Sequence, residues 1–179
     1  LPEVAEPKEL ENINPWFKEK MHKNVLSMWQ HDEPGFGVWI HTHGIDASVA
    51  VNNYQSAKCE YLDNFKPEYF KEYYRGNANC PGCPNNCIKC YSTDEKKSKV
   101  GGLHQEIIGA MGPNIGNQSA KTIIDANVLC NELGMDPNSL GYVISFAQEC
   151  SQRGILKENE LNLSFTDEAD SLKLVEMIA

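Results

Sequence analysis

Apolar side chains recur every three or four residues near the start of the chain, which is the spacing of one face of a helix. The dipeptide at residues 14–15, Asn-Pro, supplies an N-cap followed by a proline at the first helical position. The sequence therefore predicts an amphipathic helix from residue 15 to about residue 31. Residues 1–13 are acidic, contain prolines and lack this periodicity, so they are predicted to form a linker or arm. The apolar positions of the predicted helix are Phe17, Met21, Val25, Met28 and Trp29.

The strongest helical patterns lie in the second half of the chain. Ser119 precedes an apolar stripe that ends before Gly134, and Asp136 precedes a second stripe that ends before Gly154. Serine and aspartate are favoured N-caps, and glycine is favoured just past a helix C-terminus. We therefore predict helices over residues 119–133 and 136–153, and a last helix that starts at residue 166 or 167. The residues expected to face the core are Ala120, Ile123, Ile124, Val128, Leu133, Leu140, Val143, Ile144, Ala147 and Cys150.

Shorter elements are predicted between these regions. Residues 66–74 are expected to form a helix initiated by proline, residues 38–44 an extended segment, and residues 45–51 a short helix. No convincing strand pattern follows residue 90. The predicted fold class is therefore all-α, with a multi-helical domain over residues 14–179.

Length and charge narrow the classes of function. The chain has 179 residues and a formal net charge of −9, which argues against nucleic acid and against an anionic membrane surface as partners. No apolar run approaches the roughly 20 residues of a membrane span, and no leader pattern is present. Seven cysteines without a secretory context predict a cytoplasmic protein. Because the chain starts without Met and ends inside a helical pattern, we expect a fragment of a longer protein.

Four of the seven cysteines, Cys80, Cys83, Cys87 and Cys90, fall within eleven residues. Thiolates gathered on a polar, proline-containing loop predict a soft metal ion or an iron–sulfur cluster. A disulfide framework is disfavoured because the cysteine number is odd and near neighbours pair poorly. A zinc-stabilised helical adaptor is a further alternative, although the two ligand pairs of a zinc knuckle usually lie a dozen or more residues apart.

The cysteine spacing can be interpreted in two ways. Read from Cys80 it is C-x2-C-x3-C, and read from Cys83 it is C-x3-C-x2-C. The second form resembles the signature of radical S-adenosylmethionine enzymes. That family needs a strand before the loop and alternating strands and helices after it, whereas helices are predicted on both sides here. The radical enzyme is therefore kept as an alternative.

Two further segments hold candidate catalytic or binding residues. His41 and His43 lie in the predicted extended segment, where both side chains would project to one side and line a pocket. His104 and Glu106 lie in a glycine-rich, otherwise apolar segment. A carboxylate in such surroundings tends to be partly desolvated, which raises its affinity for protons and suits an acid/base role. The alternative is a glutamate at a helix start, stabilised by the helix dipole.

Three motifs in order resemble a known family. They are C-x2-C-x3-C at residues 80–87, Gln-Glu-Ile-Ile-Gly at residues 105–109, and Asn-Glu-Leu-Gly-Met-Asp-Pro at residues 131–137. Together they are similar to the middle, helical domain of the tungsten- or molybdenum-containing aldehyde ferredoxin oxidoreductases. The resemblance covers most of residues 15–179.

The resemblance implies a set of site residues. It implies that Cys80, Cys83 and Cys87 bind a [4Fe–4S] cluster, with a fourth thiolate from a later domain and Cys90 as a local substitute. Glu106 would lie near a metal held by tungstopterin or molybdopterin. One of two pterins would rest on the turn between the two strong helices, whose residues are Asn131, Gly134, Met135 and Asp136.

The implied activity is the oxidation of small aldehydes to carboxylic acids, with ferredoxin or another electron-transfer protein as acceptor. The full-length enzyme is expected to form a homo-oligomer, and the fragment alone is expected to be inactive. The chain departs from the family pattern at Gln105 and Ile107, which replace a tyrosine and a threonine, and at Asn131 and Met135, which replace an aspartate and a leucine. These departures leave the substrate open, and the catalytic subunit of an aromatic acyl-CoA reductase is the alternative within the family.

Overall fold

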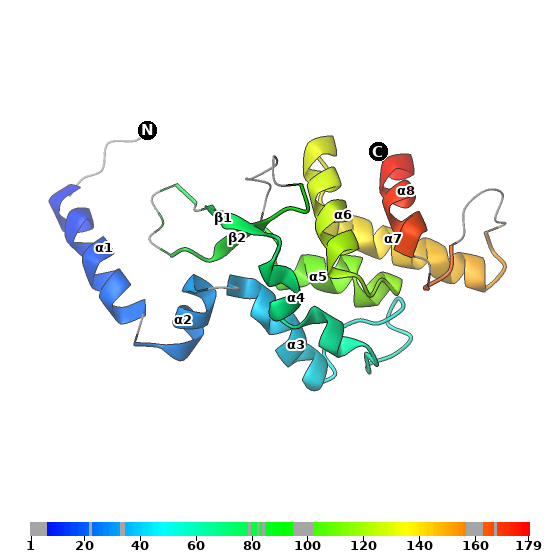
Figure 1. The fold of residues 1–179 in the computed structure, drawn as a ribbon, viewed down its shortest axis with the longest axis horizontal. Coiled ribbons are helices and arrows are strands. Elements are labelled where there is room, and N and C mark those ends of the chain that lie inside the picture. The colour runs from blue at the N-terminus through cyan, green and yellow to red at the C-terminus, as the bar shows by residue number, and fades with distance from the viewer. Residues whose placement is uncertain are drawn as a thin grey trace.

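The fold is mostly helical, which confirms the predicted class (Figure 1). A computed structural model describes residues 7–21, 23–32, 35–78, 80–81, 83, 85–94, 102–156, 163–166 and 168–179. The α-helices are α1 (Pro7–Met21), α2 (Val25–His31), α3 (Val38–Ile45), α4 (Glu68–Lys71), α5 (Gln105–Met111), α6 (Ala120–Leu133), α7 (Pro137–Gln152) and α8 (Glu168–Ile178). Short 3-10 turns are η1 (Gly35–Gly37), η2 (Leu62–Phe65) and η3 (Pro113–Ile115). None of the described helices is both long and apolar enough to cross a bilayer.

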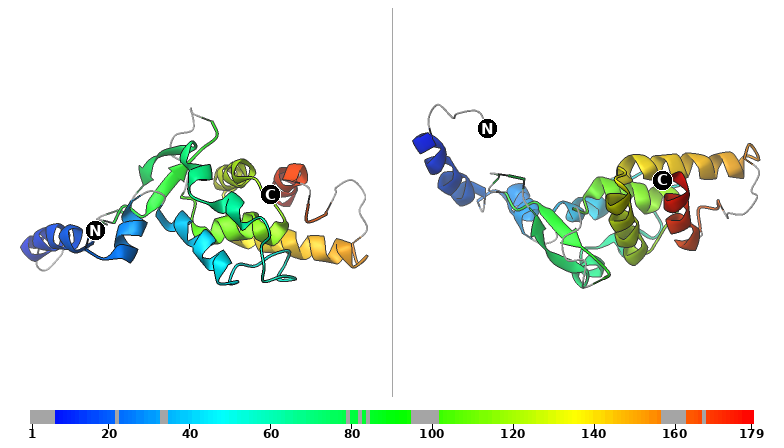
Figure 2. Two further views of the ribbon diagram at one scale, coloured as in Figure 1. Left: turned by 60° about the horizontal axis from the view of Figure 1, so that its bottom comes forward. Right: turned by 90° about the horizontal axis from the view of Figure 1, so that it is seen from above.

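Helix α5 lies at the centre of the core and packs against α3, α6, α7 and η3. Its residues Ile108, Ala110 and Met111 are buried. A Cβ atom added to Gly141 of α7 would lie 2.6 Å from the Ala110 carbonyl oxygen, so only glycine lets α7 cross α5 this closely. Helices α6 and α8 pack side by side, and α7 crosses them (Figure 2).

The two strong helices begin and end where the sequence predicts. Ser119 Oγ accepts a hydrogen bond from the Thr122 amide at 3.2 Å, and Gly134 ends α6 with a φ of +72°. The predicted inward faces are partly wrong, because Leu133 and Val143 are exposed. On α7 the buried positions include the polar residues Ser145 and Gln148, which a purely apolar pattern does not select.

The N-terminal helix differs from its prediction. Helix α1 begins at residue 7 and contains Pro15 inside it, and the chain turns at residues 23–24 before α2 starts. Trp16 of α1 is exposed, and α1 lies at one end of the molecule, away from the helical body (Figure 1). The single helix predicted over residues 15–31 is therefore two helices. The division into an arm and a helical domain stays a prediction.

Strands flank the cysteine-rich stretch, where the sequence predicts none. Strand β1 (Tyr74–Ala78) pairs antiparallel with β2 (Ile88–Tyr91), with Ala78 opposite Ile88 and Gly76 opposite Cys90. The helix predicted over residues 66–74 is only α4, one turn long. The helix predicted over residues 45–51 is also wrong, since the chain turns after Ile45 and Val51 forms an isolated bridge with Ser56.

Candidate active site

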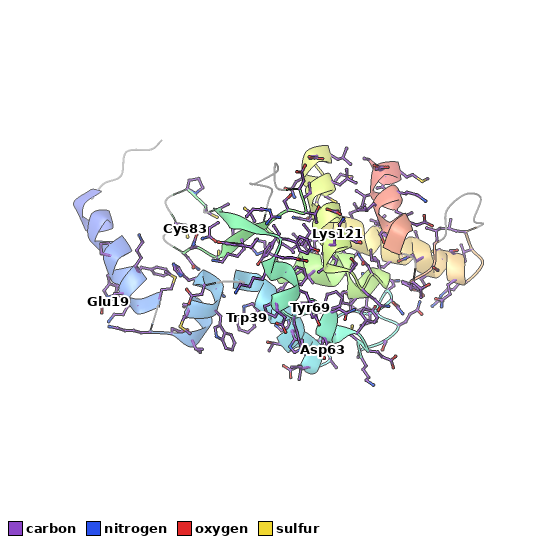
Figure 3. The ribbon with its side chains drawn as sticks, in the orientation of Figure 1. Glu19, Trp39, Asp63, Tyr69, Cys83 and Lys121 are labelled. Carbon is purple, nitrogen blue, oxygen red and sulfur yellow. The ribbon has the colours of Figure 1, made fainter. Side chains whose placement is uncertain are left out.

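The cysteine loop joins strands β1 and β2, and their pairing holds its two ends together. The Ala78–Ile88 pair closes the ladder directly before the loop, and Cys80, Cys83 and Cys87 all lie within it. Lys89 of β2 is 2% exposed, and its Nζ donates to the His31 carbonyl oxygen at 2.5 Å. This bond ties β2 to the end of α2, so the loop extends beside the N-terminal helices, with Cys83 far from Lys121 of α6 (Figure 3). Gly82 and Pro84 lie outside the described residues.

The Cys87 thiol is affected electrostatically by the other two thiols of the loop. Burial raises the pKa of Cys87, and the nearby Cys83 and Cys80 thiols raise it further. Thiolates gathered in this way repel unless a cation lies between them, and soft sulfur donors suit iron–sulfur clusters and zinc. The loop thus offers three donors of the chemical type that such clusters use, with Cys80 exposed and the other two partly exposed.

The thiols of Cys80, Cys83 and Cys87 do not lie close enough together to form a metal-binding site. Within the described part of the chain, no three His, Cys, Asp or Glu side chains lie close enough to hold a single metal ion. Cys90, the predicted local substitute for a fourth ligand, is 2% exposed in β2 opposite Gly76 rather than in the loop. Its burial favours a place in the core over a place beside the loop thiols.

The prediction for His41 and His43 is wrong in its geometry. Both residues lie in α3, where positions two apart point in different directions, and not in an extended segment. His41 Nε2 lies 3.3 Å from Asp63 Oδ1, at the surface. His43 instead lines a pocket, with its ring 6.0 Å from the ring of Trp39. Only His43 therefore remains a pocket residue.

That pocket joins three helices and contains Glu106. Its cavity of about 180 Å³ lies between α3, α5 and α7, and the segment that follows α3 completes it. Gln105 Nε2 donates to Glu106 Oε1 at 3.2 Å, which leaves the second carboxylate oxygen available. The expected desolvation of Glu106 is wrong for this chain, because Glu106 is exposed in the first turn of α5. The pocket is lined by Ile40, His43, Ser48, Val49, Ala50, Gln105, Glu106, Gly109, Asn138 and Tyr142.

His104 lies outside this pocket. It is the N-cap of α5, and its side chain makes no capping hydrogen bond. A Cβ added to Gly102 would lie 3.3 Å from His104 Nε2, so the imidazole ring packs against the preceding backbone. The structure therefore places His104 and Glu106 in one element but not in one cavity.

The turn between α6 and α7 is built by local hydrogen bonds. The Met135 amide donates to the Cys130 carbonyl at 2.8 Å, and Asn131 Nδ2 donates to the Asn127 carbonyl at 2.7 Å. Asp136 accepts from the Asn138 and Ser139 amides, and the hydrogen bond from the Ser139 hydroxyl lowers the pKa of Asp136 most. Asn138 follows the turn by two residues and lines the Glu106 pocket. The turn residues themselves do not line that pocket.

Sequence reasoning missed Tyr142 and Asn138. Both lie on α7, and Tyr142 was assigned to neither the core nor a site. The signal was available only in part, because residues 138 and 142 are one helical turn apart and share a face. This face of α7 contacts α5 through packing between distant segments, which the sequence pattern does not reveal.

The helical fold agrees with the comparison to known families. Residues 13–179 match the family "Aldehyde ferredoxin oxidoreductase, domains 2 & 3". The chain belongs to this family of oxidoreductases. This membership favours an enzyme over the zinc-stabilised adaptor and the radical S-adenosylmethionine enzyme.

Several relatives come from the genus Pyrococcus. The WOR-like subunit of an aliphatic sulfonate oxidoreductase of Pyrococcus furiosus is 29% identical over 99% of this chain and 29% of its own length. A tungsten-containing aldehyde ferredoxin oxidoreductase of the same organism is 31% identical over 71% of this chain and 21% of its own length. The enzyme of that name from Pyrococcus abyssi is 29% identical over 68% of this chain. The chain spans less than a third of the length of these relatives.

Proposed function

We propose that this chain is the cluster- and pterin-binding part of an enzyme that oxidises small aldehydes to carboxylic acids. The observation that carries the proposal is the cavity in which Glu106 of α5 meets Asn138, two residues after the turn assigned to pterin. Residues from distant parts of the sequence converge there, as a site for carbonyl chemistry requires. Ferredoxin or a similar electron-transfer protein would take the electrons.

The chain's own residues have separate roles in this proposal. Oxidation of an aldehyde with water to an acid releases two electrons and two protons. Tungstopterin or molybdopterin would supply the two-electron chemistry. The Glu106 oxygen that is not bonded to Gln105 would accept a proton, while His43 would line the side of the cavity formed by α3. Cys80, Cys83 and Cys87 would hold a cluster that removes the electrons one at a time.

A second candidate is redox chemistry on an aliphatic sulfonate, favoured by the relative that matches 99% of the chain. The charge of the cavity argues against it. Its described lining contains the Glu106 carboxylate and neither lysine nor arginine, with His43 as the one residue able to become cationic. A sulfonate anion would be repelled by Glu106, whereas a neutral aldehyde would not.

The test uses the full-length, cofactor-loaded enzyme under anaerobic conditions, with propionaldehyde as substrate and ferredoxin or a viologen dye as acceptor. Glu106→Gln should lower kcat about 10²- to 10⁴-fold, because the carboxylate proton acceptor is lost. Glu176→Gln, at an exposed carboxylate of α8, is the matched control and should leave kcat unchanged. Equal activity of the two variants would contradict the role of Glu106. Turnover of ethanesulfonate or of an aromatic acyl-CoA, but not of any aldehyde, would contradict the substrate class.

A further inference from the structure

Tyr142 forms the wall of the Glu106 cavity on the side of α7. It lines the cavity together with Asn138, one helical turn before it, and is 38% exposed. The Ala110 carbonyl lies where a Gly141 side chain would be, so the two helices are in backbone contact directly beside Tyr142. The position of the Tyr142 backbone relative to Glu106 is therefore fixed by helix packing.

A second tyrosine supports this wall from outside. The ring of Tyr54 stacks on Tyr142 with centroids 6.0 Å apart and an angle of 10° between the ring planes. A hydrogen bond with Tyr54, then burial and the nearby Tyr54 and Glu106 charges, raise the pKa of Tyr142 to about 12. The phenol of Tyr142 thus stays neutral beside the carboxylate. Tyr54 itself is 68% exposed and fills no core position, so core packing does not account for its placement.

The backbone that presents Tyr54 is held in an unfavourable conformation. Asn52, Asn53 and Tyr54 have φ angles of +49°, +53° and +63°. Residues with a Cβ rarely enter this left-handed region, and three in succession persist only where the surroundings impose them. Such strain occurs preferentially at functional sites.

A chain of hydrogen bonds imposes this conformation. The Asn52 and Asn53 amides donate to the Pro113 and Asn114 carbonyls, both at 3.0 Å. Ser145 of α7 donates to Asn53 Oδ1 at 3.0 Å, and Asn53 Nδ2 donates to Glu149. The turn at residues 52–54 is therefore hydrogen-bonded to α7, the helix that contains Tyr142.

From these contacts we propose that Tyr142 is a specificity-determining residue that limits the width of the substrate, and that Tyr54 is a positioning residue that holds the Tyr142 ring in place. The proposal rests on the proposed function for the identity of the cavity. In this proposal the Tyr142 ring selects slender, unbranched aldehydes over wide aromatic ones. Removing the Tyr142 ring should widen the cavity, and removing the Tyr54 ring should let the Tyr142 ring move, while the Glu106 carboxylate is kept in both variants.

The experiment compares propionaldehyde with benzaldehyde in the full-length, cofactor-loaded enzyme. The readout is the ratio of the two kcat/KM values, because a loss of folded enzyme lowers both values equally and leaves the ratio unchanged. Tyr142→Ala should raise the benzaldehyde-to-propionaldehyde ratio at least 10-fold, and Tyr54→Ala should raise it by a smaller factor. Tyr142→Phe keeps the ring and should stay within twofold of the wild type. Phe146→Ala is the matched control, since Phe146 is a more exposed ring of α7 outside the cavity.

An unchanged ratio in Tyr142→Ala, or an equal change in Phe146→Ala, would overturn the proposal. A second measurement separates this failure from that of the proposed function. Saturation-transfer NMR with 1-propanol and benzyl alcohol reports entry into the cavity without turnover. One outcome is that Tyr142→Ala admits benzyl alcohol where the wild type excludes it, although no aldehyde is oxidised. That result would contradict the proposed function and support the role of Tyr142 in limiting the width of the cavity. If the wild type, Tyr142→Ala and Tyr54→Ala all admit benzyl alcohol equally, the proposed role of Tyr142 in limiting substrate width is contradicted.

Discussion

The carboxylate of Asp136 has a structural role and a proposed cofactor role. It caps α7 by accepting hydrogen bonds from the Asn138 and Ser139 amides, at 3.3 and 2.9 Å. Family resemblance also assigns it to the pterin site. The two roles can be separated, because asparagine caps a helix nearly as well as aspartate but lacks the charge.

Asp136→Ala should therefore lower the free energy of unfolding by about 0.5–2 kcal/mol, through the lost cap. Asp136→Asn should stay close to the wild type in this measurement, which is made by denaturant unfolding at pH 7. In the full-length protein, both variants should bind less pterin per chain. Unchanged stability in Asp136→Ala would show that the cap contributes nothing.

The same carboxylate predicts a pH dependence. Its folded pKa is lowered by the Ser139 hydrogen bonds, so it lies below the unfolded value of about 3.9. The stabilisation is therefore complete above about pH 5 and is lost as the pH falls through the folded pKa. Acid unfolding of Asp136→Asn should show a correspondingly shallower loss of stability between pH 4 and pH 2 than the wild type shows. Superimposable acid transitions would contradict this assignment.

Helices with local start and stop signals were the elements that sequence could predict. Ser119, Gly134 and Asp136 act through hydrogen bonds and backbone angles within a few residues, and these signals hold whatever the rest of the chain does. The hairpin escaped prediction because β1 is a short, glycine-containing strand stabilised by its partner. The segment containing His41 and His43 is helical because Ile40 packs under Gly109 of α5, a contact between distant residues.

The candidate site was predictable only in part, as the fold was. Glu106 and the Asn131–Asp136 turn were found through sequence motifs, and the cysteine loop was found through its spacing. The walls of the cavity were not, since Tyr142 and Ser48 meet Glu106 only after α3, α5 and α7 have packed. Motifs thus locate the chemistry, while packing determines what surrounds it.

The cysteine hairpin allows a prediction at the level of an element. Anaerobic reconstitution of the protein with iron and sulfide should give a broad visible absorbance, and Cys83→Ser should weaken it strongly. Cys150→Ser is the control, because Cys150 lies on α7 outside the loop, and its absorbance should match the wild type. Zinc without iron in the anaerobically purified protein would contradict the cluster, as would full absorbance in Cys83→Ser.

At the C-terminal side of the described chain, two backbone segments approach each other very closely. A Cβ on Gly116, which follows η3, would lie 1.4 Å from the Phe165 carbonyl oxygen. Phe165 lies just before α8, so this contact helps to hold the segment that leads into α8 against the turn that follows η3. No side chain can be accommodated there without moving the segment.

Gly116→Ala should therefore be strongly destabilising. Gly154→Ala is a matched control, because both glycines have a φ near +70° but nothing lies within 4 Å of a Cβ at Gly154. The control should lower the unfolding free energy by about 1–2 kcal/mol, the penalty of the left-handed angle alone. The difference between the two variants, measured by thermal or denaturant unfolding, reports the steric clash. Equal losses would show that the segment before α8 moves freely.

The central position of α5 also constrains how the chain comes to be folded. Its surroundings are contributed by α3, which precedes it, and by α6 and α7, which follow it. During synthesis on the ribosome, which proceeds at about 5–20 residues per second, the side of α5 that α7 covers stays unburied until residue 141 has emerged. The hairpin is complete earlier in the sequence, so the cysteine loop emerges before the Glu106 cavity can form.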